Sequence, residues 1–278
     1  MMKKITIRKG QLGLLSRQGD YYQVLDAGEH RLPWFNTPDV LVINTDGSEI
    51  PEALAEYLRR FQPTWVEQYC VVADLTDTEA GALYVNGVLQ EILPPATRRL
   101  YWQADEALKL VRMDTRQVLV PVDVMNAVLQ PRRSGAVKGR EAILTVQVPA
   151  WHVGVLKIDG ETQALLLPGL TAYWKVNHLI EAEVVDTRLQ VLEVGGQEIL
   201  TKDKVNLRLN LAANWRYRDV LLAFGQLTKP LDHLYRELQF ALREAVGTRT
   251  LDELLEDKQV IDEVVSAQVK ARMTPFGI

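Results

Sequence analysis

The sequence predicts an α+β fold: three repeated small antiparallel β modules, the third of which leads into a carboxyl-terminal α+β part with two amphipathic helices. Three features predict this fold. Three glycines each recur 141 residues further along the chain, and the pair Tyr101-Trp102 recurs as Tyr173-Trp174, 72 residues further along. The carboxyl-terminal third carries apolar residues at helical spacing. Because self-similarity of this kind is typical of repeat architectures, we expect related units along the chain.

The glycine repeat defines the first and third modules. The recurring pairs are Gly13 and Gly154, Gly19 and Gly160, and Gly28 and Gly169. Glycine adopts positive φ without steric cost, so Gly19 and Gly160 are expected to close hairpins. Gly28 and Gly169 are expected to open the segment after the second strand of each hairpin.

A further copy lies between these two. Asn86-Gly87 sits between two apolar runs, which is typical of a hairpin. Tyr101-Trp102 and Asp114-Thr115-Arg116 return 72 residues later, whereas Gly87 and Gly160 are 73 apart, so this copy carries a one-residue gap. The modules are therefore expected over 5–46, 71–116 and 143–188. The alternative is that short hairpins merely share turn residues.

The repeated tryptophans, Trp102 and Trp174, are expected to pack at the base of their hairpins. Stacking on a ligand is the alternative, but a ligand site would not need repetition.

The connecting segments complete the predicted domain division. Residues 1–50 form the first hairpin module, 51–70 a helical connector, 71–129 the second module, 130–142 a basic linker, and 143–278 the carboxyl-terminal domain. A helix is expected over Pro51 to Phe61, with proline in its first turn. The basic linker is interpreted as a solvated loop, or alternatively as a contact with anionic lipid.

After the third module, two strands and two helices are expected. The strands run over Val191–Ile199 and Val205–Tyr217, joined by a turn at Thr201–Lys204. The first helix covers Pro230–Val246 and ends at Gly247, and Thr250 with Glu253 forms a capping box for the second. The residues expected to share one apolar face are Val205, Leu207, Leu209 and Leu211 in the strand, and Leu231, Leu234, Tyr235, Leu238, Ala241, Leu242 and Ala245 in the first helix. The second helix is expected to bury Leu251, Leu254, Leu255, Ile261, Val264 and Val265.

Composition argues against several function classes. The net charge of −4 disfavours general attraction to nucleic acid. The amino terminus has no apolar core of a signal peptide, and no window approaches the ~18 apolar residues of a spanning helix. Cys70 lies in an apolar run and is interpreted as a buried structural thiol.

No residue pattern for catalysis, cofactor binding or metal binding is found. His30, His152, His178 and His233 have no second histidine or cysteine within four residues. Phosphate-binding loops and a nucleophile elbow are absent from the sequence. The acidic cluster of Asp252, Glu253, Glu256 and Asp257 is explained by the dipole at a helix start. We therefore predict no catalytic, cofactor or metal residues, and no enzyme.

The carboxyl-terminal half resembles the stomatin–prohibitin–flotillin (SPFH, band-seven) superfamily. Three segments carry the resemblance: Gln190–Glu193 with Glu198–Val205, Ala241–Gly247 with Thr250–Leu255, and Thr274–Ile278, which is similar to the segment that begins the family's next strand. It covers about 143–278, whereas residues 1–142 resemble the family only through the repeated hairpin.

This resemblance implies a slipin-like, non-enzymatic scaffold that forms homo-oligomers and organises a membrane region or regulates a partner protease or channel. It further implies a cytoplasmic location, peripheral at the inner face of a membrane, with membrane lipid and a membrane protease as partners. The family carries an apolar anchoring hairpin where this sequence has extra β modules. Because the family continues into a helical or coiled-coil tail, we expect the 278 residues to be a truncated form whose assembly depends on that tail.

Two other functions stay open. Stacked β modules ahead of such a domain also resemble the major vault protein in architecture, which implies a soluble cage- or shell-forming protein. An accessory module that binds a peptide or lipid is the third alternative.

Overall fold

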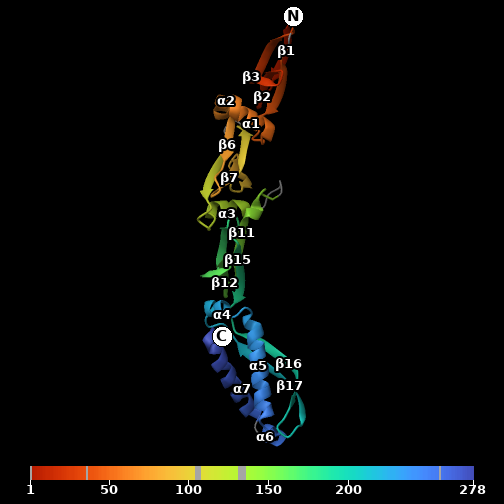
Figure 1. Ribbon diagram of the computed structural model, residues 1–278, viewed down its shortest axis with the longest axis vertical. Helices are drawn as coiled ribbons and strands as arrows, with labels where there is room; N and C mark the ends of the chain where they lie inside the picture. The colour runs from red at the N-terminus through yellow and green to blue at the C-terminus, as the bar shows by residue number, and fades with distance from the viewer. Residues whose placement is uncertain (1, 36, 104–107, 131–135, 257) are drawn as a thin grey trace. The chain divides into compact units, whose positions relative to one another are not determined.

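The computed structural model describes residues 2–35, 37–103, 108–130, 136–256 and 258–278 (Figure 1). The chain divides into two compact units: Met1–Thr145 with Thr171–His178, and Val146–Leu170 with Leu179–Ile278. The predicted five-part domain division is finer than this partition and stays a prediction.

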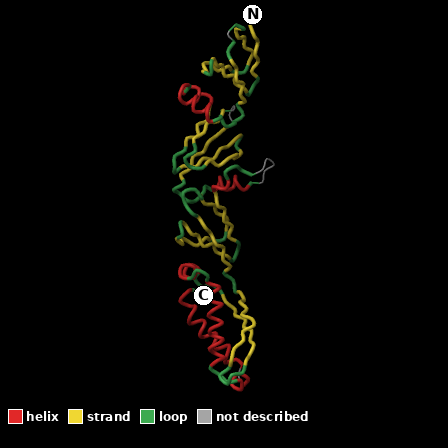
Figure 2. The backbone as a smooth tube through the Cα atoms, turned by 45° about the vertical axis from the view of Figure 1, so that its right-hand side comes forward, coloured by secondary structure: helices red, strands yellow, loops and turns green. Residues whose placement is uncertain are grey.

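Three five-strand modules repeat the same pairing. In the first, β1 (Met2–Ile7) pairs with β4 (Gly28–Pro33), and β2 (Gln11–Arg17) pairs with β3 (Asp20–Leu25) and β5 (Asp39–Asn44). Each module thus combines a two-stranded and a three-stranded antiparallel sheet, whose strands are drawn in yellow in Figure 2.

The second and third modules follow the same order. In the second, β6 (Cys70–Asp74) pairs with β9 (Arg98–Trp102), and β7 (Glu79–Val85) pairs with β8 (Val88–Leu93) and β10 (Leu108–Asp114). In the third, β11 (Ile143–Val148) pairs with β14 (Gly169–Trp174), and β12 (His152–Ile158) pairs with β13 (Glu161–Leu166) and β15 (Ile180–Asp186). The predicted fold class, with its repeated β modules, is confirmed.

The turn glycines do what their spacing predicts. Both central residues of each hairpin turn have positive φ, the combination that type I′ turns require. The φ values are 53° and 92° at Gln18-Gly19, 50° and 75° at Asn86-Gly87, and 52° and 85° at Asp159-Gly160. Gly28 and Gly169 begin β4 and β14, as expected.

A second repeated glycine allows the two sheets of each module to pack closely. A Cβ at Gly13 would lie 2.9 Å from Cδ1 of Ile7 in β1, and one at Gly154 would lie 3.1 Å from Cγ2 of Val148 in β11. Gly81 is the equivalent residue in the second module, because a Cβ there would lie 3.2 Å from Cδ1 of Leu75, which directly follows β6. The predicted glycine repeat does not include Gly81.

Short helices connect the modules. α1 (Glu52–Phe61) and α2 (Pro63–Tyr69) follow the first, and the predicted Pro51–Phe61 helix is confirmed, with Pro51 as its N-cap. α3 (Val122–Leu129) and the 3-10 turn η1 (Arg140–Ala142) follow the second module's strands, and neither is predicted by the sequence patterns.

The predicted basic linker is packed where the structure describes it, and residues 131–135 lie outside the described residues. Val137 is buried, and the Lys138 carbonyl accepts a hydrogen bond from the Ile92 amide at 2.9 Å. This segment therefore extends the edge of β8.

The carboxyl-terminal part is a long hairpin covered by helices. β16 (Gln190–Leu200) pairs with β17 (Asn206–Trp215), and the Thr201–Lys204 turn between them is confirmed. α4 (Val220–Gln226) is followed by α5 (Pro230–Gly247), α6 (Leu251–Glu256), α7 (Lys258–Met273) and the 3-10 turn η2 (Thr274–Phe276). α5 and α7 lie side by side (Figure 1), and α5 packs on β16. The buried core includes Val194, Ile199, Trp215, Leu234, Leu238, Leu242, Val265 and Met273.

Several predictions for these helices are wrong. Leu231 is 44% exposed, because the first turn of α5 lines a shallow pocket beside β15 instead of the core. Leu255 is 60% exposed, because the short α6 buries only Leu254. The segment predicted to form one second helix forms two helices, α6 and α7. Gly247 is the last residue of α5, and Thr248 is its C-cap with right-handed geometry.

Candidate interaction surfaces

Consecutive modules are connected by an apolar cluster that we term the module joint. The first joint buries Trp102 against Leu14 of the first module's hairpin and Leu58 of α1. The second buries Trp174 against Ala82 of the second module's hairpin and Val124 of α3. Leu14 and Ala82 each follow the close-packed glycine, so the two joints use equivalent positions.

Backbone hydrogen bonds repeat in the joints as well. The Ile50 amide donates to the Leu100 carbonyl at 2.8 Å, and the Val120 amide donates to the Ala172 carbonyl at 2.9 Å. The segment that leaves the first module, and the one that leaves the second, thus pairs with the two-stranded sheet of the following module. A proline N-cap, Pro51 or Pro121, then starts a helix. The predicted packing role of the tryptophans is confirmed, since Trp102 and Trp174 are 4% and 0% exposed.

The repeated Asp-Thr-Arg segments have a structural role. The Thr115 hydroxyl donates to the Thr78 carbonyl at 2.9 Å, and the Thr187 hydroxyl donates to the Trp151 carbonyl at 2.7 Å. The arginine that follows each threonine donates to the aspartate before it. Hydrogen bonds from Arg188, followed by its charge, hold the pKa of Asp186 well below its usual range.

The single thiol and the histidines occupy structural positions. Cys70 is buried, and burial raises the pKa of its thiol to about 12, with Arg59 acting weakly in the opposite sense. The His30 ring lies 2.8 Å from the Asp26 carbonyl, and that of His152 lies 3.0 Å from the Ala150 carbonyl. Among the described residues, no three His, Cys, Asp or Glu side chains gather in a geometry that could hold a metal ion.

The acidic cluster caps a helix. Glu253 accepts a hydrogen bond from the Thr250 amide at 2.7 Å, and this bond lowers the pKa of its carboxyl. The Glu253 amide donates to the Thr250 hydroxyl at 3.4 Å, so the predicted capping box is confirmed. Asp203 adds a long-range cap by accepting from the Leu251 amide at 3.2 Å. Asp257 lies outside the described residues.

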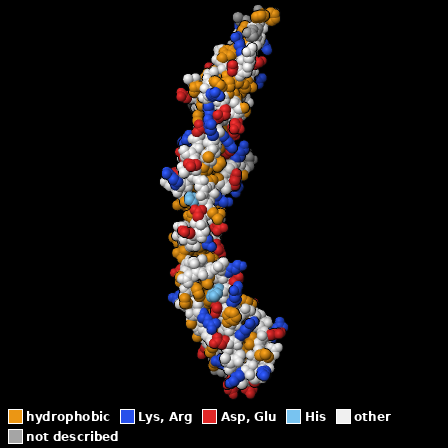
Figure 3. Space-filling model, viewed as in Figure 1, with side chains coloured by type: hydrophobic (Ala, Val, Ile, Leu, Met, Phe, Trp, Pro, Cys, Tyr) orange, Lys and Arg blue, Asp and Glu red, His pale blue; other side chains and the backbone are white. Residues whose placement is uncertain are grey.

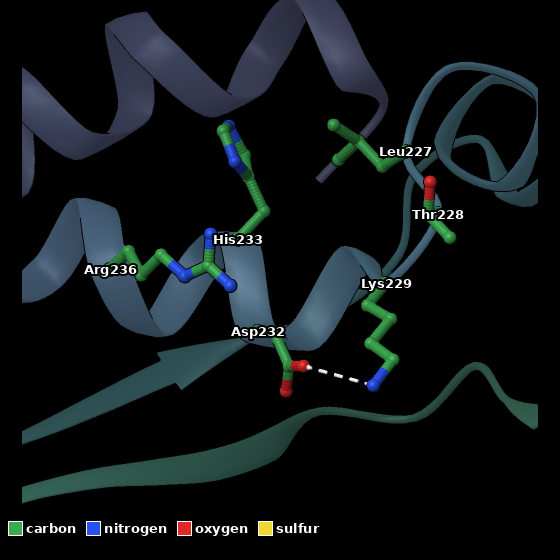
Figure 4. Close-up of a pocket in the computed structure, with 6 residues that line it drawn as sticks. All are labelled: Leu227, Thr228, Lys229, Asp232, His233 and Arg236. Atoms are coloured by element: carbon green, nitrogen blue, oxygen red, sulfur yellow. Dashed lines mark ion pairs between the residues drawn. The ribbon is translucent and has the colours of Figure 1, made fainter.

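A small pocket lies at the start of α5 (Figure 4). Its volume is about 230 Å³, and it is lined by Leu227, Thr228, Lys229, Asp232, His233 and Arg236. Lys229 and Asp232 form an ion pair at 3.9 Å, and the His233 ring packs edge-on against Phe276 at 5.3 Å. This pocket therefore combines opposite charges with an imidazole that packs against Phe276.

A larger groove of about 680 Å³ runs between β17 and α7. Apolar side chains such as Leu211, Val265 and Ile278 line it, together with the polar Asn214 and Ser266. At its end, η2 is fixed by Gly277, whose carbonyl accepts hydrogen bonds from the Arg218 and Asp219 amides at 2.7 and 3.0 Å. Thr274–Ile278 is thus a turn docked against the start of α4.

The described residues contain no helix that is both long and apolar enough to cross a membrane.

These elements define the class of the second unit: an α+β domain whose long hairpin is covered by helices and preceded by a β module. Residues 146–278 match the SPFH domain / Band 7 family, and the match starts at the residue where the second compact unit begins. The carboxyl-terminal half of the chain is therefore an SPFH/Band 7 domain.

The relatives of this chain include stomatins. A stomatin homolog of Pyrococcus horikoshii is 33% identical over 98 residues, which are 35% of this chain and 37% of that protein. An uncharacterized protein of Archaeoglobus fulgidus is 30% identical over 134 residues, 47% of this chain and 52% of that protein. Mouse stomatin is 28% identical over 94 residues, 34% of this chain and 33% of that protein. The chain thus spans between about a third and about half of the length of these relatives.

Proposed function

We propose that this chain is a non-enzymatic scaffold of the stomatin/prohibitin type, which assembles with further copies of itself and organises a region of membrane or regulates a partner protease or channel. The observation that carries the proposal is the SPFH/Band 7 domain at the end of a series of repeated β modules. Small modules bury little apolar area alone and gain stability when neighbours cover them, so such arrays suit extended binding surfaces.

The chemistry of the described side chains supports a scaffold. The thiol is buried, and the aspartates beside Arg116 and Arg188 are bound within their own module. Location at the inner face of a membrane, and lipid and a membrane protease as partners, are parts of the same proposal.

The alternative function is a soluble cage- or shell-forming protein of the vault type. It is favoured by the module joint, because the same packing is used twice along one chain.

Two measurements test these functions. Mass photometry and light scattering over a concentration series, on this chain and on a form extended by a helical tail of the family's kind, should detect self-assembly, and strict monomers of both forms would contradict both functions. Flotation with liposomes containing anionic lipid then separates them, because a membrane scaffold should rise with the vesicles and a soluble shell should stay at the bottom.

A further inference from the structure

The strand β5 forms one edge of the three-stranded sheet of the first module. β10 and β15 hold the same place in the second and third modules. The strand registers define equivalent residues on the three edges. The glycines of the central strands, Gly13, Gly81 and Gly154, pair with Val42, Arg112 and Val184 respectively. The residues that directly follow these glycines pair with Leu41, Val111 and Glu183. The three edges can therefore be compared residue by residue.

Two of the three edge strands carry charges within the strand, whereas β5 carries a charge only at its first residue, Asp39. β10 includes Lys109 and Arg112, and β15 includes Glu181 and Glu183. Charges on an edge strand are the usual protection against pairing with another chain. β5 instead reads Val40-Leu41-Val42-Ile43, and Leu41 and Val42 are 40% and 43% exposed.

The outer face of the same module is polar. In the second module, the face of the two-stranded sheet that enters the joint carries Val72, Leu100 and Trp102. The equivalent places in the first module hold Lys4, Arg31 and Pro33, all exposed, and Lys4 forms an ion pair with Glu29 at 2.6 Å. A polar outer face is typical of a capping repeat, so this face is unsuited to a further joint.

We propose that β5 pairs antiparallel with β5 of a second copy of this chain, about a two-fold axis at Val42. Such a contact is isologous, so each strand supplies the same surface. It would place Val42 opposite its own copy, Leu41 opposite Ile43, and the charged Asp39 opposite the neutral Thr45. No like charges would face each other across the pair, which favours self-pairing.

The loop before β5 adds apolar area to this contact. Trp34 and Phe35 are 64% and 82% exposed, and hydrophobic side chains are visible on the surface of the amino-terminal part (Figure 3). With Leu41 and Val42, they offer roughly 400 Å² per copy, or about 800 Å² for two copies before the backbone edge is counted. This total approaches the ~1,000 Å² of a specific interface, so the pairing would give a weak dimer.

The inference rests on the proposed self-assembly and names its surface. Disulfide trapping tests the pairing directly, because Cys70 is buried, its thiol pKa is raised to about 12, and it is the single cysteine of the chain. The variant Val42→Cys should form a covalent dimer under mild oxidation. Arg112→Cys, at the equivalent place in β10, is the matched control and should stay monomeric on a non-reducing gel. Equal trapping of both variants, or none of Val42→Cys, would overturn the pairing.

A second variant tests the association without a cysteine. Leu41→Glu with Val42→Arg introduces the residues that β15 and β10 carry at these places, so the module should keep its fold and its circular dichroism. Its dissociation constant in analytical ultracentrifugation should rise at least about tenfold, because two arginines would meet at the axis. An unchanged constant, or a monomeric parent chain, would overturn the β5 pairing, whereas strict monomers of the parent chain and of a tail-extended form would overturn the proposed self-assembly as well.

Discussion

Leu242 and Leu231 lie on the same helix, α5, in opposite environments. Leu242 is 3% exposed in the core of the SPFH/Band 7 domain, whereas Leu231 is 44% exposed in the first turn. Apolar periodicity predicts both as buried, and the position along the helix separates them. A helix can extend beyond the sheet that it covers, and its end turns then face solvent.

This contrast gives the first prediction. Leu242→Asp should lower the free energy of unfolding by more than about 4 kcal/mol, because a buried unpaired carboxylate is costly. Leu231→Asp is the matched control and should change it by less than about 1 kcal/mol. Urea denaturation followed by tryptophan fluorescence measures both. Similar midpoints for the two variants would show that the α5 stripe is not buried.

Asp186 predicts a pH dependence. Hydrogen bonds from Arg188 lower the pKa of its carboxyl in the folded state, while the unfolded value is about 3.9. The unfolded state therefore binds the proton more readily, so this contribution to stability is present above about pH 4 and is lost as the pH falls. Asp186→Asn should lower stability at neutral pH, and its curve should converge with that of the parent chain on acidification. Urea midpoints from about pH 6 to about pH 2 test this. Curves that remain parallel would exclude the linkage.

At the scale of elements, each module depends on one close approach between its two sheets. A Cβ at Gly154 in β12 would lie 3.1 Å from Cγ2 of Val148, which is in β11 of the two-stranded sheet. The contact recurs at Gly13 and Gly81, which explains why the central strand of every module contains a glycine where a strand would otherwise favour a larger residue.

The third prediction follows from this contact. Gly154→Ala should cost about 1–3 kcal/mol, because the added methyl overpacks the space between the sheets. Gly195→Ala in β16 is the control: the nearest atom to its Cβ would be Oδ1 of Asn210 at 3.7 Å, and its φ is not positive. Its cost should stay within about 0.5 kcal/mol. Thermal unfolding by circular dichroism compares the two, and equal losses would show that the sheets can relax apart.

At the scale of the whole molecule, the two compact units have separate cores. Trp102 belongs to a joint within the first unit, and Leu242 belongs to the core of the second. Compact units with their own hydrophobic cores can unfold independently.

We therefore expect two transitions in calorimetry. Trp102→Ala removes a 4% exposed side chain and should destabilise the first unit by about 3–5 kcal/mol. Trp102→Ala should lower the transition temperature of the first unit, and Leu242→Asp should lower that of the second unit. Trp34→Ala, at a 64% exposed residue, is the control and should move neither. If both core variants shift one shared transition, the units fold cooperatively.

Features that depend only on neighbouring residues could be predicted from the residue order. Positive φ at the hairpin turns follows from Gly19, Gly87 and Gly160, because glycine adopts it freely. The Thr250–Glu253 capping box is equally local. The repeat spacing indicated three related modules, and the motifs of the carboxyl-terminal half indicated the SPFH/Band 7 domain. Spacing and motifs can both be identified from the order of the residues alone.

Which surfaces meet depends on contacts between segments that are distant in the sequence. α3 lies inside the span interpreted as the second β module, and its Val124 is buried by the joint with Trp174, which is far away in sequence. The basic linker pairs with β8 through Lys138, and Leu231 and Leu255 are left exposed. These outcomes depend on contacts between distant segments, and periodicity within one segment contains no information about what will cover it.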